Sequence, residues 1–94
     1  LSGSKGISPH RDHIKYSSII VLLNLHGNSR LGICDNRLGK NAKTINDYPG
    51  RIVILPGSKF LSRNGNDLRP LHFVDKIKSE RISIGFRYNS ELMY

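Results

Sequence analysis

Short apolar runs, separated by Gly, Pro and Asn, follow one another along this chain, and this pattern predicts a series of β-strands. The run over residues 17–25 is almost continuously apolar and rich in β-branched side chains, so we expect a strand that is buried on both faces. Residues 51–55 and 71–75 form two further compact runs. Residues 30–37 form a weaker run, which predicts a hairpin partner for the first strand.

A last strand is predicted over residues 81–88, and its two faces differ in character. Side chains alternate along a strand, so Arg81, Ser83 and Arg87 share a polar face opposite an apolar one. Gly85 lies on the polar face, where its missing side chain is expected to leave a gap for a small anion. Charged side chains seldom point into a core, so we interpret this face as part of a functional site.

The segments between the strands are predicted to be irregular. Residues 38–49 are mostly polar and predict a long loop, and residues 63–67 predict a polar hairpin loop. Residues 58–61 are expected to continue the preceding strand after a bend, and no helical pattern of useful length occurs. Six or seven short strands with this punctuation imply a single all-β domain over residues 1–94, either a sandwich or a barrel.

Charge and cysteine content narrow the class of protein. Fifteen Lys and Arg against seven Asp and Glu give a formal net charge of +8, which favours a polyanionic partner such as nucleic acid. The only cysteine, Cys34, cannot form an internal disulfide, and we expect it to be a small buried apolar residue. No apolar run is long enough to span a bilayer. These features predict a soluble intracellular protein without a membrane partner.

Two imidazoles and one carboxylate are the candidate metal ligands. His10 and Asp12 are separated by one residue and therefore share one face of an extended strand, while His72 lies in a late apolar strand. Two histidines and one carboxylate form the facial triad of non-haem Fe(II) oxygenases, which leaves the other positions of the iron open. His13 and His26 are expected to be ordinary loop residues, although His13 would compete for the metal in another strand register.

This order of motifs resembles the Fe(II)/2-oxoglutarate-dependent dioxygenase superfamily. The resemblance rests on the His-x-Asp of His10 and Asp12, on the distal His72, and on an Arg-x-Ser that begins at Arg81. A further arginine, Arg87, follows six residues after the first, as in the AlkB-like branch. The resemblance covers the C-terminal part of such a catalytic domain and implies a double-stranded β-helix, a relative of the jelly roll.

The resemblance also implies the site residues. His10, Asp12 and His72 would bind Fe(II), and 2-oxoglutarate would be the cosubstrate. Arg81 would hold the distal carboxylate of 2-oxoglutarate, because a guanidinium meets a carboxylate in a two-pronged geometry. Ser83 would add a hydroxyl donor, and Arg87 would lie near the metal-chelating carboxylate or fix the aspartate of the triad. The reaction would be hydroxylation or oxidative demethylation of the substrate.

Substrate and partners are less well specified by the sequence. The basic charge and the AlkB-like arginine spacing favour a methylated nucleic-acid base, and a protein or a metabolite remains an alternative. Family members have further structure before the His-x-Asp, so we expect a second chain or an additional N-terminal segment to complete the fold. Two alternatives from other classes are a non-catalytic basic β-barrel that binds nucleic acid and a jelly-roll assembly protein.

Overall fold

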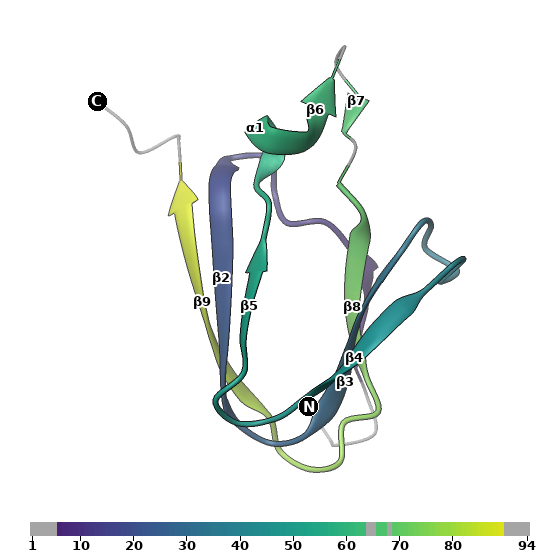
Figure 1. The fold of residues 1–94 in the computed structure, drawn as a ribbon, viewed down its shortest axis with the longest axis vertical. Coiled ribbons are helices and arrows are strands. Elements are labelled where there is room, and N and C mark those ends of the chain that lie inside the picture. Colours follow the sequence, from purple (N-terminus) through teal and green to yellow (C-terminus); the bar gives the residue numbers. More distant parts are fainter. Residues whose placement is uncertain (1–5, 64–65, 68, 90–94) are drawn as a thin grey trace.

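The regular secondary structure of the described residues consists almost entirely of antiparallel β-strands (Figure 1). The computed structural model describes residues 6–63, 66–67 and 69–89. Within these ranges a single helical turn, α1 (Ser58–Leu61), accompanies the strands β1 (Ile7–His10), β2 (Tyr16–His26), β3 (Ser29–Cys34), β4 (Lys43–Asp47), β5 (Ile52–Leu55), β6 (Ser62–Arg63), β7 (Asn66–Asp67), β8 (Leu71–Asp75) and β9 (Ile82–Asn89). The predicted all-β class is confirmed.

The strands form two facing sheets and one small hairpin. The first sheet has the order β1-β8-β3-β4 and the second the order β5-β2-β9, while β6 and β7 pair with each other. The predicted hairpin between the strands over 17–25 and 30–37 is wrong, because β2 and β3 belong to different sheets. All pairs are antiparallel. Figure 1 shows the two sheets as separate layers that loops join at the lower end. The hairpin predicted over residues 63–67 corresponds to β6 and β7, and positions 64 and 65 between them lie outside the described residues.

Strand β4 corrects the prediction of a loop over residues 38–49. Its only large apolar side chain is Ile45, so the run carries little strand signal of its own. The strand forms because β3 supplies a ladder partner for each residue, with Leu31 opposite Ile45 and Ser29 opposite Asp47. The irregular segments are therefore residues 35–42 before β4 and 48–51 after it, and Asp47 becomes a buried strand residue.

The prediction that residues 58–61 continue a strand is wrong. Gly57 lies directly against the backbone of Ser18, so closely that a Cβ at this position would overlap the Ser18 carbonyl oxygen. The chain turns away from the sheet there, and the Ser58 hydroxyl donates a hydrogen bond to the Ile14 carbonyl oxygen at 2.7 Å. Residues 58–61 then form the helical turn α1 across the end of the sandwich.

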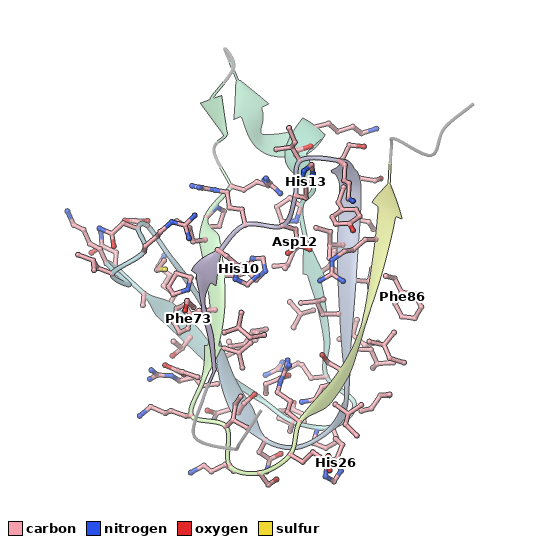
Figure 2. All side chains as sticks on the ribbon, turned by 180° about the vertical axis from the view of Figure 1, so that it is seen from behind. His10, Asp12, His13, His26, Phe73 and Phe86 are labelled. Carbon is pink, nitrogen blue, oxygen red and sulfur yellow. The ribbon has the colours of Figure 1, made fainter. Side chains whose placement is uncertain are left out.

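Strand β2 is buried on one face only, which corrects the prediction of burial on both. Its inward residues Ile20 and Asn24 are 1% and 3% exposed, whereas its outward face is open. The neighbouring strands β5 and β9 continue this open face, and Figure 2 shows Phe86 pointing away from the sandwich. We call this surface the outer apolar face; its exposed side chains are Ile19, Leu25, Ile52, Ile54, Ile82, Ile84 and Phe86.

The buried apolar residues lie on both sides of the four-stranded sheet. Leu31 and Val74, which are cross-strand partners on β3 and β8, are buried. Cys34, Leu71 and Phe73 form a small cluster, and Cys34 is 2% exposed, as predicted for a buried apolar cysteine. None of the helices in the described part of the chain is long and apolar enough to cross a membrane.

Candidate metal centre

The pairing of β1 with β8 brings His10 and His72 directly opposite each other. Residues that face each other across an antiparallel pair are close neighbours, and here the centroids of the two imidazole rings are 4.3 Å apart. Asp12 follows two residues after His10, beyond the end of the strand. Figure 2 shows His10 and Asp12 close together between the two sheets.

The ligand atoms of these three side chains converge. The Asp12 Oδ1 atom lies 3.8 Å from His10 Nε2 and 3.4 Å from His72 Nε2, and all three atoms lie within 4.8 Å of one another. Two ligands at right angles around a divalent ion are roughly 3 Å apart when each bond is about 2.1 Å long. Small rotations of the side chains would therefore be enough to hold a metal ion.

A backbone hydrogen bond determines which nitrogen of His10 faces the site. The Nδ1 atom lies 2.8 Å from the Ser8 carbonyl oxygen, which can only accept a hydrogen bond. The Nδ1 atom must therefore carry the proton, and in the neutral ring the lone pair of Nε2 points towards Asp12. Metal-binding histidines commonly donate their other N–H in this way, which fixes the ring orientation.

The environment of His72 favours the neutral imidazole that a metal requires. Burial lowers the pKa of His72 below its usual value, and the nearby charges of His10, Arg87 and Arg69 act in the same direction. The Asp12 carboxylate opposes them by favouring the protonated ring. Because the net shift is downward, His72 stays neutral over a wider range of pH than a free imidazole does.

We expect the metal-free protein to lose stability as the pH falls below about 6.5. Above this pH His72 is neutral in the folded and in the unfolded protein. Below it the unfolded chain takes up a proton at His72, whereas the folded protein does not until the pH reaches its lowered pKa. The loss continues until the pH reaches the lowered pKa of the folded state, with a slope of at most about 1.4 kcal/mol per pH unit. Urea denaturation at several pH values measures it, and His72→Asn should show a shallower decline; equal slopes would contradict the assignment.

Arg87 holds the other oxygen of the aspartate. Its Nε atom donates to Asp12 Oδ2 at 2.5 Å, while the side chain of Asp12 is only 8% exposed. The guanidinium lies over Gly85 on the same strand, so the gap expected at Gly85 for a small anion is filled by Arg87 itself. The aspartate is therefore held through Oδ2, which leaves Oδ1 free to face the two histidines.

Gly85→Ala should weaken metal binding although Gly85 is not a ligand. A Cβ at this position would overlap the Arg87 guanidinium, which would have to move away from Asp12. Loss of a residue that orients a ligand typically costs about 10-fold to 100-fold in metal affinity, and we expect the lower end here. Titration calorimetry with Mn(II) measures the effect. Ile84→Ala, on the exposed side of the same strand, is the control and should bind like the wild type.

Arg81, directly before β9, and Ser83, near the start of that strand, make contacts away from the three ligands. The Arg81 Nη1 atom donates to the Ser83 hydroxyl at 3.3 Å, and Nη2 lies 3.3 Å from Asp47 Oδ2. Asp47 also accepts a hydrogen bond of 3.0 Å from the Asn24 amide. The sequence did not indicate Asp47 as part of this polar face, because it lies in the segment predicted to be a loop.

The two remaining histidines lie outside the group of ligands. His13 accepts a hydrogen bond from the Lys15 amide through Nδ1 at 3.0 Å, and His26 is exposed at the end of β2, far from the site in Figure 2. Among the described residues, His10, Asp12 and His72 form the one group that could hold a metal ion. The Ser8 carbonyl oxygen, which orients the His10 ring, could not be identified from the sequence, because every residue has a backbone carbonyl.

Comparison with known proteins identifies no relative of this chain. No family model, no curated protein and no solved structure matches the chain.

Proposed function

We propose that this chain is the core of an Fe(II)- and 2-oxoglutarate-dependent oxygenase that hydroxylates or oxidatively demethylates its substrate. The observation that carries the proposal is the convergence of His10, Asp12 and His72. Two imidazoles and one carboxylate on one side of a cation are the donor set of non-haem Fe(II) oxygenases. Structural zinc sites, by contrast, usually have four protein ligands.

The surroundings of the three ligands fit a divalent metal. The proton on His10 Nδ1 leaves Nε2 free, and the low pKa of His72 favours a neutral ring. Arg87 occupies Oδ2 of Asp12 and leaves Oδ1 for the ion. When bound, Fe(II) would supply the dioxygen chemistry, while the protein's own residues position the ion and limit its access to water.

The order of the strands supports a double-stranded β-helix as the finer description of the fold. Strands of the two sheets alternate along the chain, apart from the β3–β4 hairpin, as in a jelly roll. One sheet has four strands and the other three, and within the described residues β9 pairs only with β2. We propose that a further segment or a second chain pairs with β9 and covers the outer apolar face.

The inward face of β9 fits a dicarboxylate cosubstrate. The Arg87 guanidinium leans back over Gly85, while that of Arg81 leans forward to Ser83. The two cations thus approach the levels of residues 85 and 83, which are about 7 Å apart along a strand. The Arg81 Nε atom is buried without a hydrogen-bond partner, so it can still donate to a carboxylate. Asp47 shares this guanidinium and would have to be accommodated beside the cosubstrate.

A groove next to His72 is the proposed place for the substrate. It has a volume of about 220 Å³ and runs between the two sheets, with an almost wholly apolar lining that includes Leu22, Leu31 and Val53. Lys43 also lines it. The apolar groove fits a methylated base flipped out of its strand. The nearby Lys43 and the net charge of +8 would attract the phosphates of the strand, which remain outside.

Formation of succinate from 2-oxoglutarate tests the proposal. The metal-free protein is supplied with Fe(II) under anaerobic conditions, air and 2-oxoglutarate are admitted, and succinate is followed by NMR. We expect succinate to form with the wild type and with His26→Ala, and to fall to the level of free Fe(II) with Asp12→Ala. A second series adds methylated single-stranded oligonucleotides, which should increase the rate. Wild-type protein that binds Mn(II) but forms no succinate would rule out the oxygenase.

A further inference from the structure

A polar hollow, separate from the apolar groove next to His72, lies at the end of the sandwich opposite α1. The β2–β3, β4–β5 and β8–β9 loops meet there, at the lower end of Figure 1, and the Lys78 amide donates to the Asn28 carbonyl oxygen at 3.0 Å. The hollow has a volume of about 420 Å³. Its lining includes three cationic side chains and a single carboxylate. It contains none of the three metal ligands, although Asp47, which lines it, also pairs with Arg81 of the proposed cosubstrate site.

The carboxylates near this hollow are already bound by arginines. Asp47, the one that lines it, is 3% exposed and lies 3.3 Å from Arg81. Arg30, which also lines the hollow, is held by Asp75 through two hydrogen bonds of 2.8 and 2.7 Å. Within each pair the positive and negative charges cancel, so the two pairs contribute little net charge to the hollow.

Two lysines supply the remaining positive charge, although the charge of Lys76 also acts on the Asp75 carboxylate. Lys76 and Lys78 are exposed and line the hollow from the β8–β9 loop. In the described part of the chain, neither ammonium group lies within ion-pair distance of a carboxylate. Because both lysines line the same hollow, an anion placed in it would be attracted by two positive charges.

Neutral polar groups complete the lining. Ser29 is 7% exposed, and its hydroxyl is a buried polar atom without a hydrogen-bond partner. Such atoms are rare in folded proteins, because an unsatisfied buried hydroxyl is unfavourable. The amide side chains of Asn28 and Asn46 belong to the same lining and offer further N–H donors.

We propose that this hollow binds a phosphate group, held by the ammonium groups of Lys76 and Lys78 with the hydroxyl of Ser29 as a neutral donor. Lysine acts as a point charge towards phosphate, and the hydroxyl would gain the acceptor that it lacks in the free protein. The phosphate belongs either to a small phosphorylated molecule or to the backbone of a polynucleotide. The site is independent of the metal centre, so it does not rest on the proposed oxygenase function.

Titration of the metal-free protein with inorganic phosphate, at constant ionic strength, tests the site. We expect saturable amide shifts in NMR spectra at residues 28–30 and 76–78. The double variant Lys76→Gln, Lys78→Gln should bind phosphate at least about 10-fold more weakly. The control Lys40→Gln, Lys59→Gln removes the same charge from two exposed positions outside the hollow and should change the affinity less than about two-fold. An equal loss in both double variants would show a bulk charge effect and overturn the proposal.

Ser29→Ala provides a second and independent measurement. Because the buried hydroxyl has no partner in the free protein, its removal should maintain or raise the stability to urea and yet weaken phosphate binding several-fold. A parallel titration with a single-stranded oligonucleotide identifies the source of the phosphate: tighter binding that depends on Lys76 and Lys78 indicates a polynucleotide. If neither ligand responds to the lysine substitutions, the hollow is not a phosphate site.

Discussion

His72→Ala should reduce the affinity for Mn(II) by about 100-fold or more. The substitution removes one of three convergent ligands, and the two that remain, His10 and Asp12, are both connected to the short strand β1. Mn(II) resembles Fe(II) in its ligand preferences and is not oxidised in air, so calorimetry can follow binding directly. The wild type should bind one ion per chain, and 2-oxoglutarate should bind more tightly once that ion is present.

His26→Ala is the matched control for this experiment. It removes the same side chain from an exposed position at the other end of the sandwich and should leave Mn(II) binding unchanged. His72→Gln keeps a polar side chain of similar size and replaces His72→Ala in case that variant does not fold. Circular dichroism measures whether each His72 variant is folded. If His72→Ala binds Mn(II) as the wild type does, the three residues are not the metal site.

Asp47→Ala should lower the free energy of unfolding by about 3 kcal/mol or more. Asp47 is buried and accepts hydrogen bonds from the Asn24 amide and the Arg81 guanidinium. Its removal would leave a cation with a 13% exposed side chain without its carboxylate partner. A single domain of this size is stable by only a few kcal/mol, so we expect the variant to be largely unfolded at 25 °C.

Asp75→Ala provides the comparison, because Asp75 also pairs with an arginine. The pair with Arg30 has shorter hydrogen bonds, yet both side chains are more than a third exposed, so water screens their attraction. We expect a loss of less than about 1 kcal/mol for this variant. Urea denaturation followed by circular dichroism measures both free energies. Similar losses in the two variants would show that burial does not determine the contribution of Asp47.

Strands with a strong apolar pattern could be predicted from the sequence. Strands that form only because they pair with a neighbouring strand could not. Strands β2, β8 and β9 follow apolar or alternating runs, so their existence was evident. Strand β4 depends on pairing with β3, and its local sequence resembles a loop. The exposure of the outward face of β2 was also hidden, because an apolar strand looks the same whether or not another layer covers it.

The candidate site was predictable as a set of residue types, but its geometry was not. His10, Asp12 and His72 attract attention because their side chains share a metal chemistry, and the structure brings them together. The direct opposition of His10 and His72 depends on a register that only the folded sheet defines. The pairing of Arg81 with Asp47 could not be foreseen, because these residues are far apart in the sequence and come together only when the two sheets pack.

The position of β1 links metal binding to the stability of one sheet edge. It has only four residues, pairs with β8 with an irregular register, and lies at the edge of its sheet. An ion shared by His10, Asp12 and His72 would fasten this edge to the rest of the sheet, so that part of the energy of metal binding becomes local folding energy. Removal of such an ion would then expose β1 to proteases before the rest of the domain unfolds.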